Sequence, residues 1–275
     1  MGRAMVRNLM KAGYDVTIYT RTKEKAQGNL DEGARWADTV AECVKDKDAV
    51  ITIVGYPQDV EEVYFGSGGI LENVNPGTLL IDATTSTPEL AVRIAAAANE
   101  KGLSALDAPV TGGERGAIAG TLTIMAGGEQ DAFDRAMPLF QAMGETIRHQ
   151  GPAGTGQHCK MANQIGISAA ISGLCEVVAY SKTVGLDPAL VLDTIKGGSA
   201  GSAQMNLLSP KVLAGDDTAA FYLKHFLKDL KIAMHESESR GRDLPGARGV
   251  MEKYQMLEDQ GYGDCGTQTL YRWYE

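Results

Sequence analysis

Four short apolar runs, separated by helical segments, constrain the fold of this chain more than any other feature. The runs are AVITIVG, TLLIDAT, LSALDAPV and TLTIMAGG, at residues 49–55, 78–84, 103–110 and 121–128. Continuous apolar runs of this length are typical of strands that are buried on both faces. Because helical segments such as 88–100 and 131–144 alternate with them, the pattern predicts a Rossmann-like, doubly wound parallel sheet of the α/β class.

The first residues fit this fold but begin at an unusual point in it. Residues 3–12 have the spacing of an amphipathic helix that ends at Gly13, and 14–20 alternate as a strand does. No strand precedes the helix, so we expect that the first strand is missing and that the chain as given binds a dinucleotide weakly. Gly2 is then the third glycine of the G-x-G-x-x-G fingerprint, which allows a helix to pack closely on its strand.

The second half of the chain carries no strand signal. Residues 160–183 have apolar or small side chains on nearly every face, which is typical of a buried helix, and further helices are predicted at 188–196, 205–213, 222–240 and 245–259. We therefore predict two domains. They are a dinucleotide-binding domain over 1–152 and an all-helical domain for substrate binding and oligomerisation over 153–275. The long apolar helix predicts a homodimer or homotetramer.

Composition excludes several classes of function. The net charge of -9 disfavours a nucleic-acid partner, because no basic stripe is available to neutralise phosphates. The sequence contains no uninterrupted run of 18 apolar residues, so we expect no membrane span. The four cysteines are far apart and form no C-x-x-C, which favours reduced thiols, a cytoplasmic protein and no metal site.

Polar residues follow the predicted strands where a dinucleotide is usually bound. Arg21 and Thr22 follow the strand at 14–20, where a carboxylate selects NAD in many dehydrogenases. A guanidinium is suited to a 2′-phosphate, so NADP is the expected coenzyme, with NAD as the alternative; a solvated turn would also explain these residues. Val54, Gly55 and Thr85 follow the next two strands and are expected beside the ribose and nicotinamide.

A second group of residues predicts catalysis on a small carboxylate. Thr111, Gly112 and Gly113 follow a strand end and can present backbone N–H groups to a carboxylate, although a plain glycine turn has the same sequence. Lys160 and Asn163 share a face at the start of the apolar helix. Burial and the helix dipole would lower the pKa of such a lysine toward neutrality, which suits a general acid and base; the alternative is a lysine that reaches the surface. Lys228 lies on a later helix, and its position is equally consistent with a role in the site and with a solvent-exposed, charged helix face.

The chain resembles the β-hydroxyacid dehydrogenases, the group that contains 3-hydroxyisobutyrate dehydrogenase and tartronate semialdehyde reductase. The resemblance runs over the whole chain and includes MGRAMVRNLMKAGYDVTIYTRT, DAPVTGGERGAIAGTLTIMAGG, GQHCKMANQ and FLKDL. It implies hydride transfer between NAD(P) and a small β-hydroxyacid or semialdehyde, with Lys160 as the catalytic lysine beside Asn163. It further implies that residues 111–113 and Lys228 grip the substrate, and that Lys228 also lies near the cofactor. The same resemblance assigns cofactor contacts to Gly2, Arg21, Thr22, Val54, Gly55 and Thr85.

Two departures from the family pattern matter. The first strand with two glycines is absent, and VGYP at 54–57 replaces the usual Leu-Pro start of that loop. Two other functions stay open at this point. They are a non-catalytic dinucleotide-binding or scaffold protein on the same fold, and an enzyme like 6-phosphogluconate dehydrogenase.

Overall fold

The computed structural model describes all 275 residues, which form two compact units, Met1–Lys160 and Met161–Glu275. The division falls inside one long helix, α9 (Thr155–Thr183), so each unit contributes part of it. The predicted domain boundary at 152–153 stays a prediction.

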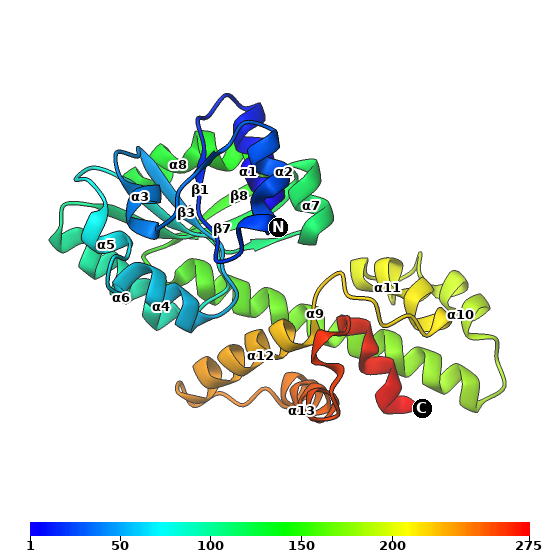
Figure 1. Cartoon of the computed structure of the whole chain (residues 1–275). Coiled ribbons are helices and arrows are strands. Elements are labelled where there is room, and N and C mark those ends of the chain that lie inside the picture. Colours follow the sequence, from blue (N-terminus) through cyan, green and yellow to red (C-terminus); the bar gives the residue numbers. More distant parts are fainter. The chain divides into compact units, whose positions relative to one another are not determined.

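The first unit is a Rossmann-like α/β domain, as predicted (Figure 1). Its main sheet has six strands in the order β3-β4-β5-β7-β6, with β8 paired to β7, and β1 pairs with β2 in a separate two-stranded sheet. The strands are β1 (Thr17–Ile18), β2 (Arg35–Trp36), β3 (Ala49–Thr52), β4 (Leu79–Asp82), β5 (Ser104–Asp107), β6 (Val110–Thr111), β7 (Leu122–Gly127) and β8 (Gly144–Gly151). The pairs β3–β4 and β4–β5 are parallel, whereas β7 runs antiparallel to β5 and β6.

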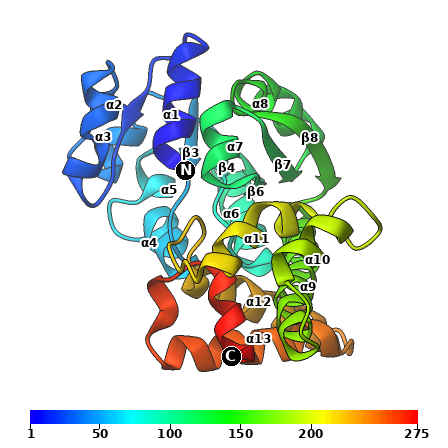
Figure 2. The same ribbon diagram turned by 90° about the vertical axis from the view of Figure 1, so that its right-hand side faces the viewer.

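Helices cover both faces of the main sheet, which explains why its central strands are apolar throughout. Along β4, Leu79 and Ile81 belong to one hydrophobic cluster and Leu80 to another, because successive side chains of a strand point to opposite faces. The first cluster includes α1 (Gly2–Lys11), α7 (Gly113–Ala119) and α8 (Gln130–Met143), which lie together in Figure 2. The second lies under α3 (Val40–Val44), α4 (Pro57–Phe65), α5 (Ile70–Asn73) and α6 (Pro88–Glu100). Two short elements, η1 (Lys23–Ala26) and α2 (Gln27–Asp31), connect β1 to β2.

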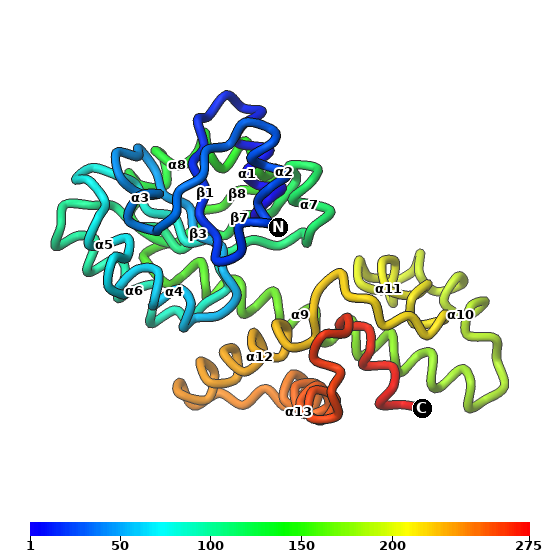
Figure 3. Tube along the Cα trace, in the orientation of Figure 1, coloured from blue at the N-terminus to red at the C-terminus, as the bar shows by residue number.

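The second unit is entirely helical, as the sequence predicts. It comprises the greater part of α9 with α10 (Pro188–Ile195), α11 (Ala203–Ala214), α12 (Leu223–Glu238), α13 (Pro245–Asp259), η2 (Tyr262–Asp264) and η3 (Thr267–Tyr274) (Figure 3). Phe226 of α12 and Tyr254 of α13 meet edge to face in its core, with ring centroids 5.4 Å apart, and both side chains are fully buried.

Helix α9 is long and apolar enough to cross a membrane by length and composition, although no uninterrupted apolar run marks it in the sequence. Within the fold, 44% of the most apolar stretch of 18 residues in this helix is buried. Three of its polar side chains, Gln157, Lys160 and Gln164, are also buried and hydrogen-bonded to other protein groups, as expected for a helix packed inside a protein.

Candidate active site

Apart from Gly2 on α1 and Lys228 in the second unit, the residues expected to hold a cofactor follow the carboxyl ends of β1, β3 and β4. Gly2 begins α1, and a Cβ added there would lie 3.2 Å from Ile53 Cγ2, just before Val54. A larger residue at position 2 would therefore crowd the Ile53 side chain at the end of β3. No side chain caps this helix and its first turn holds no acidic residue, so its positive end fits the pyrophosphate of a dinucleotide.

The loops after β3 and β4 are tied together by buried polar groups. Val54 donates its backbone N–H to Thr84 Oγ1 at 3.0 Å. Asp82, the last residue of β4, accepts hydrogen bonds from Thr52 Oγ1 at 2.9 Å and from the backbone N–H of Thr84 at 3.0 Å. The half-buried Gly55 and Thr85 lie on these two loops. A fixed pair of loops suits the predicted contacts with a ribose and nicotinamide.

Arg21 lies three residues after the end of β1, and its side chain is 72% exposed. Its Nη1 donates to Asp59 Oδ1 at 2.9 Å, while Asp59 Oδ2 accepts the N–H of Tyr56 in the capping box of α4. The neighbouring Thr22 is half-buried and precedes η1 without capping it. The guanidinium is thus directed by a carboxylate that the sequence did not single out.

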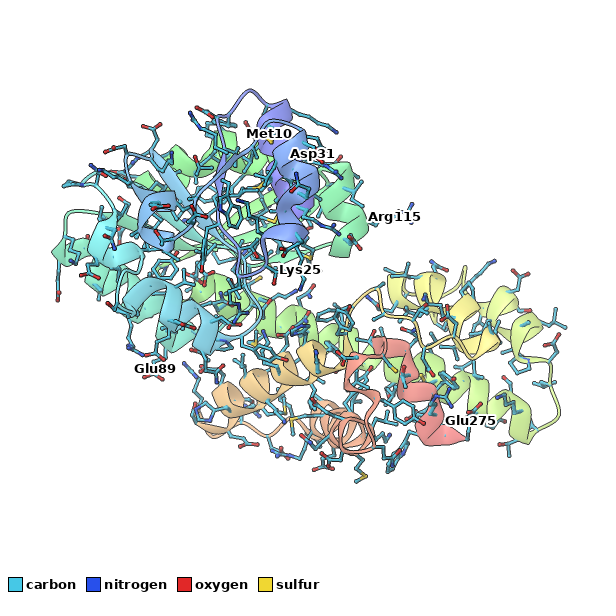
Figure 4. All side chains as sticks on the ribbon, in the orientation of Figure 1. Met10, Lys25, Asp31, Glu89, Arg115 and Glu275 are labelled. Atoms are coloured by element: carbon cyan, nitrogen blue, oxygen red, sulfur yellow. The ribbon has the colours of Figure 1, made fainter.

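Lys160 and the glycine segment at 111–113 meet in the first unit. Lys160 is only 6% exposed, and its Nζ donates to the carbonyl oxygen of Val110 at 2.9 Å. Thr111 follows directly, and Gly112 and Gly113 both have positive φ, at 123° and 63°. The two glycines therefore form a turn that leads into α7, from which Arg115 extends outward (Figure 4), and carboxylate binding by this segment stays a prediction.

One detail of the sequence interpretation is wrong. Lys160 was expected in the first turn of its helix, but α9 begins five residues earlier, at Thr155, so the lysine lies in the second turn. The dipole of a helix acts mainly within its first turn. The helix dipole is therefore a weaker influence on Lys160 than the sequence interpretation assumed.

Asn163 and Lys228 are joined by a chain of contacts in the second unit. Asn163 Nδ2 donates to Gln164 Oε1 at 2.8 Å, and Gln164 Nε2 donates to Asp229 Oδ2 at 2.5 Å. Lys228 Nζ lies 3.0 Å from Asp229 Oδ1. Gln164 and Asp229 are almost fully buried, so they fix the two residues that the sequence predicts to bind substrate. Asp229 was missed as a site residue, although a carboxylate beside Lys228 on an otherwise apolar helix face is a readable signal.

Asp107 is a second buried carboxylate that the sequence did not single out. Burial raises its pKa to about 6; N–H groups of Gly154 and Gln157 act against this shift, and the nearby Asp82 adds to it. The folded state therefore retains this proton to higher pH than the unfolded chain, whose carboxyl titrates near its ordinary value of 3.8. The contribution of Asp107 to the free energy of unfolding is full below about pH 4. It falls by about 3 kcal/mol as the pH rises through 6.

The substitution Asp107→Asn should remove this pH dependence. We expect the free energy of unfolding of the wild type, minus that of the variant, to fall by about 2.4 kcal/mol between pH 4 and pH 7. Urea unfolding at several pH values measures this difference, with Asp187→Asn as the control because Asp187 is an exposed helix cap. A difference that stays flat or rises with pH would contradict the assignment.

Two family models together match nearly the whole chain. Residues 1–151 match the NAD binding domain of 6-phosphogluconate dehydrogenase, and residues 154–274 match the NAD-binding of NADP-dependent 3-hydroxyisobutyrate dehydrogenase.

Individual relatives agree with these models. An uncharacterized oxidoreductase of Bacillus subtilis is 52% identical, with 99% of this chain and 94% of that protein covered. A probable mitochondrial 3-hydroxyisobutyrate dehydrogenase-like protein of Arabidopsis thaliana is 43% identical, with 98% and 81% covered. Among solved structures, the 3-hydroxyisobutyrate dehydrogenase of Mycobacterium tuberculosis with L-serine is 27% identical, with a TM-score of 0.89 and 99% and 94% covered.

Proposed function

Because the chain belongs to the β-hydroxyacid dehydrogenase family, and so is an NAD(P)-dependent dehydrogenase, we propose that it interconverts a short β-hydroxyacid and its semialdehyde using NADP, with Lys160 as general acid and base. One observation carries this proposal. The buried ammonium of Lys160 is held 2.9 Å from the carbonyl oxygen of Val110, directly before the predicted carboxylate-binding segment at 111–113.

When bound, the nicotinamide supplies the hydride chemistry of the reaction. In the oxidation, the neutral amine of Lys160 accepts the proton of the substrate hydroxyl as the carbon gives up its hydride. In the reduction, the ammonium returns that proton to the developing alkoxide. The contact with Val110 uses one of three N–H donors of the ammonium and directs the head group.

The carboxylate of the substrate is assigned to two groups. Backbone N–H groups at Thr111, Gly112 and Gly113 bind it from one side, since consecutive N–H groups in a turn favour an anion. Lys228 is the second group that binds the carboxylate, whereas Asn163 holds the hydroxyl or carbonyl oxygen of the substrate. Contacts through Gln164 and Asp229 connect these two side chains, which supports a joint role. Such fixed contacts position the reacting carbon and lower the entropic part of the barrier.

The coenzyme is assigned to the loops at the strand ends. Gly2 contacts the pyrophosphate, Arg21 and Thr22 the 2′-phosphate, and Val54, Gly55 and Thr85 the ribose and nicotinamide. The family resemblance also assigns Lys228 a place near the coenzyme. The description of the model matched by residues 154–274, which names an NADP-dependent enzyme, supports this choice over NAD.

A substrate panel tests the reaction. Purified protein is mixed with NADP or NAD and with 3-hydroxyisobutyrate, L-serine or 3-hydroxypropionate, and the absorbance of the reduced nicotinamide is followed. We expect turnover with at least one acid, and none with 2-methyl-1-propanol, which lacks the carboxylate. The corresponding semialdehydes are tested with NADPH in the reverse direction. Tight NADPH binding without turnover on any acid or semialdehyde would favour a non-catalytic dinucleotide-binding protein instead.

An enzyme like 6-phosphogluconate dehydrogenase is the second candidate, because the model matched by residues 1–151 carries that description. Residues 154–274 match the model of a 3-hydroxyisobutyrate dehydrogenase, so this candidate function ranks below the first. Including 6-phosphogluconate in the panel separates the two, since its oxidation would release carbon dioxide.

We also propose a homodimer or homotetramer formed by apolar side chains around the turn from α9 to α10. Large side chains are strongly exposed there, including Tyr180 at 67%, Leu186 at 53% and Leu190 at 65%. A patch of this kind on a soluble protein is usually covered by a partner.

The double substitution Leu186→Glu with Leu190→Glu should release monomers, because it places two carboxylates in the proposed interface. Light scattering after gel filtration measures the mass, and Leu213→Glu, at an exposed leucine on α11 beyond this turn, is the control. A monomeric wild type would contradict the proposal.

For location, we propose the cytoplasm, with no nucleic acid or membrane as partner. All four cysteines are free thiols, which fits a reducing compartment, and the net charge of -9 disfavours binding to phosphate backbones.

A further inference from the structure

The start of α9 is held in place by buried polar groups to which the proposed reaction gives no role. Asp107, the last residue of β5, is 4% exposed. Its Oδ1 accepts the backbone N–H of Gly154 at 2.8 Å, and its Oδ2 accepts that of Gln157, also at 2.8 Å. Both oxygens of one carboxylate therefore hold the beginning of the helix that carries Lys160.

The side chain of Gln157 ties the same turn to a second strand end. Its Oε1 accepts the N–H of Ser86 at 3.0 Å, and its Nε2 donates to the carbonyl oxygen of Thr84 at 2.7 Å. Gln157 is fully buried. Lys160 follows three residues later, about one helical turn further along α9.

Close backbone contacts leave this turn little room to move. A Cβ added at Gly156 would lie 2.6 Å from the carbonyl oxygen of Asp107, and one added at Gly127 would lie 2.6 Å from Asp107 Oδ1. The helix start therefore lies directly against β5 and β7, and a loss of its hydrogen bonds cannot be absorbed by closer packing.

We propose that Asp107 and Gln157 are positioning residues for Lys160. They fix where the first turns of α9 lie along the helix axis and how they are rotated about it, so that Lys160 Nζ reaches the carbonyl oxygen of Val110. This inference rests on the proposed role of Lys160 in proton transfer.

The substitution Asp107→Asn tests the proposal with little change in shape. An asparagine accepts through one oxygen only, and its amide nitrogen would face a backbone N–H, so one of the two bonds is lost. We expect kcat to fall between about 10-fold and 100-fold, as for a small misplacement of a catalytic group, with the KM for NADPH nearly unchanged. The thermal midpoint at neutral pH should change little, because removing a buried charge offsets the lost bond.

Two further measurements separate positioning from general damage. Hydrogen exchange should become faster at the amides of residues 154–158 in Asp107→Asn. The control is Asp134→Asn, which removes an exposed carboxylate on α8 that accepts a hydrogen bond from Gln130 Nε2 at 2.8 Å; it should leave both kcat and this exchange unchanged. If Asp107→Asn does not fold, Gln157→Met takes its place, since it keeps the side-chain volume but loses both hydrogen bonds. Normal kcat in the folded variant with faster exchange would overturn the proposal.

A double-mutant cycle distinguishes this proposal from the function on which it rests. If Asp107 acts through Lys160, Asp107→Asn lowers kcat in the wild type but not in Lys160→Ala. If it lowers the residual rate of Lys160→Ala by the same factor, the positioning role is wrong, although Lys160 can still be catalytic. If Lys160→Ala itself keeps full turnover, the proposed function fails.

Discussion

Replacing Lys160 with alanine is expected to lower kcat by a factor of about 10² to 10⁴, the range in which a general acid and base contributes to catalysis. The affinity for NADPH should stay nearly unchanged, because the substitution changes none of the residues assigned to the coenzyme. The loss arises because no other group then accepts the proton of the hydroxyl as hydride leaves the carbon. Steady-state kinetics with the substrate found in the panel, together with NADPH fluorescence titration, measures both quantities.

Lys160→Arg is the informative companion variant. Arginine keeps the positive charge but is effectively always protonated, so it cannot act as a base in the oxidation. It should therefore be almost as slow as the alanine variant. Added methylamine should partly restore turnover in Lys160→Ala, since a small amine can enter the space that the side chain leaves.

A matched control lies on the same helix. Lys182 is 58% exposed near the end of α9 and pairs only loosely with Glu275, at 3.5 Å. Lys182→Ala should keep wild-type kcat. Equal losses in Lys160→Ala and Lys182→Ala would show that the effect comes from the helix and not from the buried amine.

The fold was predictable where single segments carry their own pattern. The apolar run at 49–55 contains β3, and 245–259 is predicted and observed as α13 with the same bounds. Strand β8, by contrast, has the polar sequence GETIRHQG, and its pairing with β7 gives it strand structure. Strand β2 has only two residues, too few for any periodicity. The antiparallel direction of β7 also depends on contacts between distant segments, which no local pattern encodes.

The candidate site divides in the same way. Lys160 could be predicted because a basic residue in an apolar helix is chemically conspicuous. The role of Asp107 in holding the start of α9 could not be predicted, because its hydrogen bonds reach Gly154 and Gln157, which are 47 and 50 residues away. Likewise, Arg21 was found from its place after a strand, but its partner Asp59 lies 38 residues further on.

Arg21 is expected to decide between the two coenzymes, and its replacement by alanine should show the second large effect. A hydrogen bond to a charged group contributes about 1.5–3 kcal/mol, so KM for NADPH should rise about 10- to 100-fold. KM for NADH should change little, because NADH has no 2′-phosphate. The ratio of kcat/KM for the two coenzymes measures the effect directly.

The geometry of Arg21 is compatible with the proposed phosphate contact, although the side chain is paired with a carboxylate. Asp59 contacts the guanidinium through Nη1, and the Arg21 side chain remains 72% exposed, so its fork is accessible from solution. Arg7 offers a matched control, because it forms a similar exposed pair with Glu32 in the same unit. Arg7→Ala should leave the coenzyme ratio unchanged. If Arg21→Ala weakens NADPH and NADH equally, the residue supports the loop after β1 and does not read the 2′-phosphate, and the preference for NADP must then come from another residue.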